Sequence, residues 1–559
     1  MVKKNNFLIL ILLFLLTLPI IWPLFSPSFY SFHDETQIAN LYHYFKAIDN
    51  GQFPPRWASD AHFKFGSPLP QFNYQLPYML AYIFHLPGLS LIASFKVVLI
   101  ISVILGALGM FYLSRLFASS GIALVASLLY TYTPYRAVNL YVRGALGESL
   151  ALGLFPWVLF FGLVLVKKPD LRRLSIFSLS LGLLLITHQL AAVLTLPFIL
   201  LAIFLYAYVV KRQEVKKLLI SITLGVASAA FYLLPALLEK PFIKADSPFN
   251  FYDHFPFIRQ LIYSPWGFGA SLWGPNDDMS FQLGLISLLV LAASLISLPR
   301  LKGKLDAIDK LLFITFLAFI FATLFLLNIR SSFFWRVFPF TQLVQFPWRL
   351  LLNTTLFIPL LSVFLLKSLP TKLRQIATLT LVPLIIFSNL SYFMPSEFKN
   401  YTDDYFLRRF LPTAVLLPGE SVSADYLNHA EDYLPLPALA TRPKALPSSR
   451  LEAPTADIKI IEDRPYYLRV ELSADRPQPL TVNTFFFPGW QVTLNGQVVK
   501  PSLEKLGAMT LNLPAGSSQL KVAFKDTPLR LFSNIISLIS LSIIIALLLL
   551  HERNSTTRA

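Results

Sequence analysis

The chain has 559 residues, of which 55% are apolar and 14% are charged, and its formal net charge is +17. A soluble protein carries roughly 25% charged residues, whereas here long apolar runs approach the roughly 20 residues that cross a bilayer. This composition excludes a soluble enzyme, a nucleic-acid-binding protein and a disordered scaffold, and it predicts a polytopic α-helical membrane protein. The absence of cysteine excludes disulfides, thiolate metal sites and cysteine nucleophiles.

The apolar segments predict about 12 transmembrane helices. They lie near residues 7–25, 93–113, 121–134, 149–166, 174–187, 190–210, 217–237, 281–298, 311–328, 350–367, 373–392 and 529–550. The first resembles a signal peptide, but no small-residue cleavage site follows it, so we interpret it as a retained span. The apolar segment 76–86 is too short to cross a bilayer and is expected to be a re-entrant or interfacial helix.

Lys and Arg concentrate in alternate turns between these segments, as expected of cytoplasmic loops. This distribution predicts a multi-pass protein of the cytoplasmic membrane with both termini in the cytoplasm. Three longer regions then lie outside: an outer loop over residues 26–92, a middle loop over residues 238–280, and residues 394–528.

The last of these regions has a different composition. From about Lys459, short segments alternate apolar and polar residues, and Asn495–Gly496 separates two of them, which is a strong hairpin signal. The sequence therefore predicts three parts. These are a transmembrane domain over residues 1–393, an extracytoplasmic β-sandwich-like domain over residues 394–528, and a final transmembrane helix with a cytoplasmic tail over residues 529–559.

Ionisable residues near a membrane are costly, which makes them candidates for function. Separate outer segments are expected to bring such side chains to one face: Asp34, Glu35, Arg56, Arg143, Glu148, His188 and Arg349. Carboxylates with arginines suit transfer of a group from a phosphate, because a carboxylate can act as base and arginines can neutralise the leaving phosphate. The chain has no Walker A motif, dinucleotide-binding fingerprint or HExxH motif, so no nucleotide cofactor is expected.

Several of these residues lie in longer motifs that resemble a known family. Residues 33–84, "YTPYRAVNLYVRGALGE", "THQL", "QFPWRLL" and "FFPGWQVTLNGQ" occur in the order found in bacterial membrane proteins described as pyruvoyl-tetrahydropterin-synthase-related. That family is similar to the GT-C fold of polyprenyl-phosphate-dependent glycosyltransferases and oligosaccharyltransferases. The resemblance implies a catalytic base at Asp34 and a second acidic residue at Glu148. The chain lacks the zinc-binding histidine triad that the pterin part of the family description suggests.

Each candidate residue also has a structural alternative. Asp34 could cap the helix that begins near Thr36, and Glu148 could complement a helix dipole. Arg349 could belong to an interfacial belt, His188 could be a turn residue satisfied by backbone, and Arg56 could pack the outer loop instead of clamping a phosphate.

Together, the resemblance and the residues predict a membrane glycosyltransferase of GT-C type at the outer face of the membrane. A polyprenyl-phosphate lipid would donate the sugar, and a cell-envelope glycan or lipid would accept it. Glu35 and Glu148 are candidate ligands of Mg²⁺ or Mn²⁺, since carboxylates suit such ions. The alternatives are a transporter or lipid flippase and a non-catalytic scaffold for envelope assembly.

Overall fold

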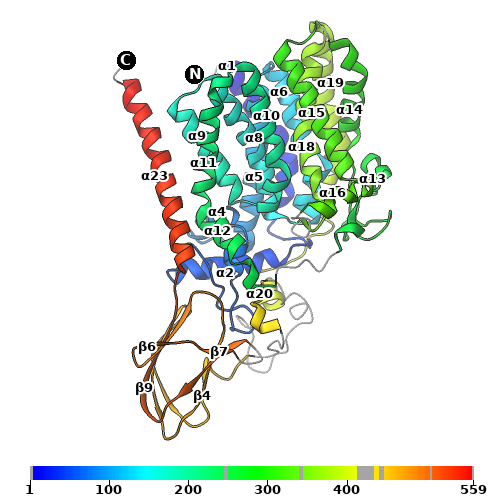
Figure 1. Ribbon diagram of the computed structural model, residues 1–559. Helices are drawn as coiled ribbons and strands as arrows, with labels where there is room; N and C mark the ends of the chain where they lie inside the picture. Colours follow the sequence, from blue (N-terminus) through cyan, green and yellow to red (C-terminus); the bar gives the residue numbers. More distant parts are fainter. Residues whose placement is uncertain are drawn as a thin grey trace.

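The computed structural model describes residues 4–244, 250–301, 303–338, 344–411, 433–439, 446–503 and 507–556. A bundle of long apolar helices forms one part of the molecule, and a β domain extends from one end of it (Figure 1). The helix α23 (Pro528–Thr556) runs from the β domain along the side of the bundle.

The helices that correspond to the predicted spans follow the chain in the expected order. They are α1 (Lys4–Ile21), α5 (Leu91–Ser114), α6 (Ser120–Thr131), α8 (Leu146–Lys167), α9 (Leu171–Leu185), α10 (Gln189–Val210), α11 (Val215–Ser228) with α12 (Ala230–Leu238), α14 (Leu285–Ser297), α15 (Ala307–Leu326), α18 (Leu351–Ser368), α19 (Thr371–Asn389) and α23. Among the described residues, eight helical segments are long and apolar enough to cross a membrane.

The other helices that correspond to predicted spans are too short or too strongly bent to be counted as membrane crossings by length. α11 and α12 meet at a bend of 68°, and α6 and α14 are shorter apolar helices. α9 has 15 residues, which corresponds to about 22 Å of helix and is less than a hydrocarbon core of about 30 Å. The molecule is therefore a polytopic α-helical protein, as predicted. Helix length alone supports eight crossings among the described residues, so the number of 12 remains a prediction.

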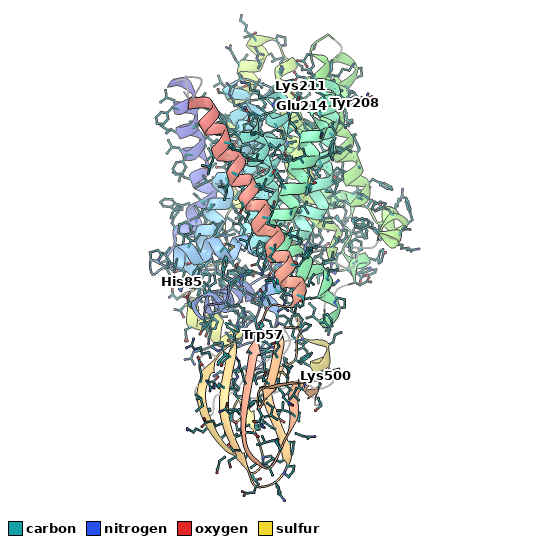
Figure 2. All side chains as sticks on the ribbon, turned by 60° about the vertical axis from the view of Figure 1, so that its left-hand side comes forward. Trp57, His85, Tyr208, Lys211, Glu214 and Lys500 are labelled. Carbon is teal, nitrogen blue, oxygen red and sulfur yellow. The ribbon has the colours of Figure 1, made fainter. Side chains whose placement is uncertain are left out.

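The two ends of the bundle differ in what they carry. The first turn of α1 and the last turn of α23 lie at the end away from the β domain (Figure 1). Lys211 and Glu214 lie at that same end, whereas Trp57 and Lys500 lie at or beyond the other end (Figure 2). The turn after α10, which contains Lys211, thus lies on the side of the termini (Figure 2).

The β domain consists of two antiparallel sheets, as the alternating sequence predicts. One sheet has the order β1 (Leu451–Glu452), β4 (Gln478–Phe485), β8 (Ala508–Leu513) and β7 (Ser502–Leu503). The other has the order β2 (Asp457–Arg464), β3 (Tyr467–Ala474), β9 (Gly516–Phe524), β5 (Trp490–Leu494) and β6 (Gln497–Val499). Asn495 and Gly496 connect β5 to β6 with φ angles of 49° and 81°, which is the left-handed geometry of a two-residue hairpin turn.

The outer loop between α1 and α5 lies at the junction of the bundle and the β domain. It contains α2 (Thr36–Asp49), α3 (Leu69–Phe72) and α4 (Leu76–His85). α4 is the short apolar helix expected at residues 76–86. Trp57 is buried against Phe487 and Trp490, so the outer loop contributes directly to the hydrophobic core of the β domain. The boundaries of the transmembrane domain, the β domain and the final helix are those predicted from the sequence, and the structure does not test them.

Candidate functional site

A charged cluster lies where the chain passes from α6 to α8. The connection contains α7 (Pro134–Ala137) and a π-helical turn over Val138–Val142. Tyr135, Asn139 and Arg143 are four residues apart, a spacing that places side chains on one face of a helix. π-helical turns occur frequently at functional sites, and here the turn leads directly to Glu148 in the first turn of α8.

Glu148 is the centre of this cluster, and its side chain is fully buried. Its Oε2 atom lies 3.0 Å from Nη1 of Arg143 and 3.9 Å from Nε of Arg349. Its Oε1 atom accepts hydrogen bonds from the hydroxyl of Tyr135 and, at 3.3 Å, from Nδ2 of Asn139. One carboxylate therefore holds two guanidinium groups in fixed positions, and removing it would leave buried positive charges without compensation.

Arg143 also contacts an aromatic ring and a neighbouring amide. Its guanidinium lies 4.8 Å from the ring centroid of Trp348 and donates a hydrogen bond to Asn139. Burial by itself lowers the pKa of Arg143, but the charges of Glu148, Tyr135 and Asp34 together raise this pKa above its ordinary value. Arg143 is therefore a permanent cation at the centre of a water-poor site.

Arg349 reaches the cluster from the short helix that precedes α18. Its Nη2 atom donates to Oε1 of Gln345 at 3.0 Å, and its side chain is only 10% exposed. The neighbouring Trp348 is buried and stacks on Phe346. Neither side chain therefore faces lipid as an interfacial belt would require, which favours the functional role predicted for Arg349.

Asp34 lies beside Arg143 and is only partly buried. Its backbone N–H donates to the carbonyl of Arg143 at 2.9 Å, and the N–H of His33 donates to Val142 at 3.0 Å. Within the described chain the carboxylate of Asp34 accepts no hydrogen bond, and the residue at the N-cap of α2 is Glu35. The helix-capping alternative for Asp34 is therefore not what the structure shows, and the carboxylate is free to contact a ligand.

His188 lies close to the cluster but has a structural role of its own. Its Nδ1 atom accepts a hydrogen bond from the N–H of Ala191 at 3.0 Å and thereby caps α10. Its ring stacks on Tyr74 with the centroids 4.9 Å apart. Burial lowers the pKa of His188 to about 3, so the ring is neutral at physiological pH. These contacts favour the turn role that the sequence left open over direct substrate binding.

Glu35 points to different partners from those of Glu148. Its Oε2 atom lies 2.8 Å from Nη1 of Arg409 in α20 (Asp403–Phe410), and its Oε1 atom accepts a hydrogen bond from Ser31 at 2.9 Å. No group of three or more His, Cys, Asp or Glu side chains that could hold a metal occurs among the residues searched. Since arginines bind both carboxylates, their arrangement does not fit a divalent cation shared by Glu35 and Glu148. The predicted Mg²⁺ or Mn²⁺ stays a prediction.

Arg56 belongs to a second charged cluster at the junction with the β domain. Its Nη2 atom donates to Oδ1 of Asn534 at 3.0 Å. Close to it, Arg530 of α23 forms a buried ion pair of 2.9 Å with Glu239, and the charges of both affect the pKa of Arg56. Burial is the main influence and lowers this pKa to about 10. This position favours the packing role for Arg56 over a phosphate clamp.

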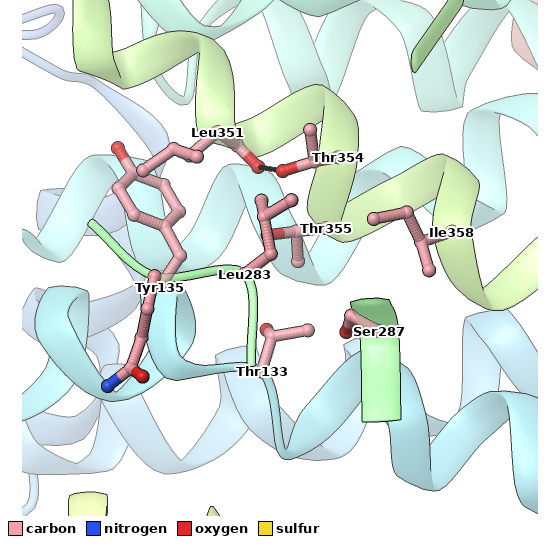
Figure 3. A pocket seen from close by; sticks show the side chains of 9 residues that line it. Thr133, Tyr135, Leu283, Ser287, Leu351, Thr354, Thr355 and Ile358 are labelled. Atoms are coloured by element: carbon pink, nitrogen blue, oxygen red, sulfur yellow. Dashed lines mark hydrogen bonds between the residues drawn. The ribbon is translucent and has the colours of Figure 1, made fainter. Parts of the chain in front are cut away.

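A small cavity of about 10 Å³ lies next to the cluster, with Tyr135 in its lining (Figure 3). Its other lining residues come from the start of α14, from α18 and from the segments just before α7 and α14: Thr133, Gln282, Leu283, Ser287, Leu351, Thr354, Thr355 and Ile358. Figure 3 shows the Thr354 hydroxyl donating to the carbonyl of Leu351, at 2.8 Å. A cavity of this size has room for about one water molecule.

Sequence reasoning did not identify Tyr135, Asn139, Gln345 or Tyr74 as members of the site. The signal for the first two was present, because they precede Arg143 by eight and four residues within the same motif. Gln345 and Tyr74 have no such local signal. They reach the site only through contacts between segments distant in sequence.

The fold and the charged cluster define a class, that of integral membrane proteins with a buried polar site at one end of a helical bundle. Within this class, residues 71–254 match the model of a family described as the 6-pyruvoyl-tetrahydropterin synthase related domain, a membrane protein. The family resemblance expected from the sequence is thus confirmed over this segment. No curated protein matches the chain.

Solved structures give a weaker likeness. The chain is similar to the arabinofuranosyltransferase AftD from Mycobacteria with a TM-score of 0.47 and 16% sequence identity, over 72% of this chain and 28% of that enzyme. A mutant form of AftD gives a TM-score of 0.42 at the same identity, over 72% of this chain and 29% of that one. The chain thus spans less than a third of AftD, and this level of likeness carries no conclusion about activity.

Proposed function

We propose that this protein is a membrane glycosyltransferase of GT-C type. It transfers a sugar from a polyprenyl-phosphate donor to a glycan or lipid acceptor of the cell envelope. The observation that carries the proposal is the position of a partly exposed carboxylate, that of Asp34, beside a cluster with two buried guanidinium groups, those of Arg143 and Arg349. This combination suits a reaction that removes a proton from one substrate and releases a phosphate from the other.

The proposed reaction is a single displacement. The Asp34 carboxylate takes the proton of an acceptor hydroxyl, whose oxygen forms a bond to the anomeric carbon of the donor sugar. The bond between that carbon and the phosphate oxygen breaks at the same time, and the electron pair remains on the polyprenyl phosphate. Arg143 and Arg349 stabilise the negative charge that develops there.

Glu148 acts in this scheme as a positioning residue. Its Oε2 atom lies between the two guanidinium groups, and its Oε1 atom is occupied by Tyr135 and Asn139. A carboxylate with these donors is stabilised as an anion and has little capacity to accept a proton. Its contribution is therefore to hold the cations in place before substrate binds, which avoids reorganisation during the reaction.

The proposal also assigns the two ends of the bundle. The end that carries the termini and the basic turns faces the cytoplasm, in agreement with the positive-inside rule. The site and the β domain then face the outside of the cytoplasmic membrane. A polyprenyl lipid reaches such a site through the bilayer and brings the energy of its phosphate bond with it, so no nucleotide is required.

The test uses the purified full chain in lipid nanodiscs with radiolabelled polyprenyl-phosphate sugars and envelope glycan acceptors. We expect transfer by the wild type and a loss of about 100- to 10,000-fold in Asp34→Asn, since a positioned general base contributes this much. Asp253→Asn, at a carboxylate of the middle loop, is the matched control and should retain activity. Full activity in a folded Asp34→Asn protein, or no turnover of any donor by the wild type, would contradict the proposal.

One observation favours the flippase alternative. Arg136 is buried within the bundle, where its guanidinium donates to the carbonyls of Ser102 and Leu152 and lies 4.8 Å from the ring centroid of Tyr130. A cation at this depth is costly, and such residues often mark substrate paths. Transbilayer movement of a fluorescent polyprenyl-phosphate lipid, measured in vesicles without acceptor, would support this alternative if Arg136→Leu abolished it.

A further inference from the structure

A surface groove lies between the end of α2 and the turn that joins β2 to β3. Its volume is about 290 Å³, and it is lined by Asn50, Glu462, Arg464, Tyr466 and Tyr467. Figure 1 shows α2 lying across the junction between the bundle and the β domain. We propose that this groove binds an uncharged stretch of glycan chain.

The lining chemistry is that of a carbohydrate site. Tyr467 contributes an aromatic ring, an apolar surface that can pack against the C–H face of a sugar, while the ring of Tyr466 packs partly against the core of the β domain. The ammonium of Lys521 lies 5.3 Å from the centroid of the Tyr467 ring and adds a hydrogen-bond donor beside it. Glu462, Arg464 and Asn50 supply acceptors and donors for neighbouring hydroxyl groups. Nε of Arg464 lies 2.7 Å from Oε1 of Glu462, so the two charges compensate each other. Among the five lining residues the net charge is therefore zero, which favours a neutral polar ligand over a phosphate or an acidic chain.

The groove is also held in a defined shape. The hydroxyl of Tyr466 donates to the carbonyl of Trp57 at 3.1 Å, and its own carbonyl accepts from the N–H of Phe524 at 2.9 Å. The pairing of β2 with β3 shifts between Ile460 and Glu462. Irregularities of this kind often redirect side chains next to binding sites. Strand pairing and the outer loop thus fix the lining before any ligand arrives.

The position of the groove suggests which part of a substrate it binds. α2 has 14 residues, corresponding to about 21 Å of helix. Asp34 lies just before α2 begins, and Asn50 lies directly after it ends. The groove is therefore separated from the charged cluster by a length of several sugar rings. It would bind a part of the acceptor remote from the reacting hydroxyl. This assignment to an acceptor rests on the proposed function, whereas glycan binding itself does not.

The first experiment measures binding alone. The full chain in nanodiscs is tested by saturation-transfer NMR against neutral tetrasaccharides of glucose, mannose, galactose and arabinose, and against a tetrasaccharide of galacturonic acid. We expect at least one neutral tetrasaccharide to bind, and both Tyr467→Ala and Glu462→Gln to weaken that binding at least tenfold. Glu471→Gln is the matched control, because Glu471 is a similarly exposed carboxylate of β3 in an ion pair with Lys459.

The proposal would be overturned if no neutral tetrasaccharide binds. It would also be overturned if the galacturonic acid tetrasaccharide binds more tightly than every neutral one, or if both groove variants bind as tightly as the wild type. Because the two substitutions lie on different strands, agreement between them also separates loss of the groove from misfolding of one strand. A melting temperature equal to that of Glu471→Gln completes this control.

The second experiment separates this inference from the proposed function. Asp34→Asn should retain full tetrasaccharide binding while losing transfer. The groove variants should raise KM for a tetrasaccharide acceptor at least tenfold, leave kcat within twofold, and leave a monosaccharide acceptor unaffected. Binding that depends on Tyr467 in a protein without any transferase activity would sustain the groove and contradict the proposed function. If the wild type transferred sugar but all variants had the same KM, the proposed function would stand and the groove would be contradicted.

Discussion

Two buried arginine–glutamate ion pairs in the described part of the chain, Arg143–Glu148 and Arg530–Glu239, differ in their surroundings. Arg143 and Glu148 are joined by a second guanidinium and lie beside the partly exposed carboxylate of Asp34. In the other pair, Glu239 accepts hydrogen bonds from Arg530, Gln71 and Thr527. Burial and charge are thus alike in the two clusters. The clusters differ in that the first has beside it a carboxylate, that of Asp34, which accepts no hydrogen bond within the described chain.

The largest expected effect separates the two pairs directly. Glu148→Gln and Glu239→Gln should each lower the free energy of unfolding by about 3–5 kcal/mol, since each leaves a buried guanidinium without its counter-charge. Only Glu148→Gln should also reduce transfer per folded molecule, by roughly 100-fold or more, because it releases both site arginines. Thermal unfolding in detergent and the nanodisc transfer assay provide the two measurements. Equal activity in the two variants would remove the distinction between the clusters.

A smaller effect is expected when charge is kept and geometry is changed. Arg349→Lys retains a cation but loses the planar fork that contacts Gln345 and faces Glu148. Transfer should fall roughly 100-fold, with kcat affected more than the donor KM. Arg56→Lys is the matched change in the other cluster and should leave kcat within twofold. If Arg56→Lys lowered kcat as much as Arg349→Lys does, Arg56 would have to be counted among the residues that contact the substrate.

The pH dependence of stability tests how dry the site is. Burial lowers the pKa of His188 to about 3, below its value of about 6.5 in the unfolded chain. The unfolded state therefore binds more protons between these values, so this contribution to stability is complete above pH 6.5 and is lost as the pH falls towards 3. Between pH 7 and pH 5 the loss amounts to about 2 kcal/mol.

His188→Asn isolates this contribution, because asparagine can cap a helix but does not titrate. The wild type should lose more thermal stability than the variant when both are moved from pH 7 to pH 5. Parallel losses in the two proteins would show that His188 is hydrated in the folded state.

The smallest effect on activity concerns single hydroxyl groups. Tyr135→Phe removes a donor to Glu148, and Thr527→Val removes the corresponding donor to Glu239. Each should cost about 1.5–3 kcal/mol of stability, the range for hydrogen bonds to charged groups. Only Tyr135→Phe should also lower kcat, by a few-fold, since Asn139 still holds Oε1 of Glu148. A change of kcat in Thr527→Val would link the second cluster to the reaction.

Much of the fold follows from local patterns in the sequence. Apolar length located the helices of the bundle, and alternation located the main strands of the β domain, including the turn at Asn495 and Gly496. The bend between α11 and α12 was not foreseen, because the apolar run over residues 217–237 is continuous and contains no glycine or proline at the break itself. The part played by Trp57 in the β domain was also missed, since it depends on a contact between distant segments.

The members of the candidate site that could be predicted are the charged residues expected at the membrane face. The structure brings together three of the residues from separate outer segments, Arg143, Glu148 and Arg349. Asp34 lies next to Arg143. Arg56 and Glu35 satisfy the same criterion in the sequence, yet they pair with Asn534 and Arg409. Charge at a membrane face therefore identifies candidates, while the choice among them depends on partners that only the tertiary structure supplies.

The contact between the outer loop and the β domain also constrains how the protein is made. Tyr466 and Trp57 are joined by a hydrogen bond although they are 409 positions apart. Biosynthesis proceeds from the N-terminus at about 5–20 residues per second, so the loop emerges tens of seconds before the strands that cover it. During that interval Trp57, Phe65 and Phe72 have no hydrophobic partner from the β domain. A nascent chain that stalls before β2 thus exposes an aromatic surface, a recognisable target for chaperones and proteases.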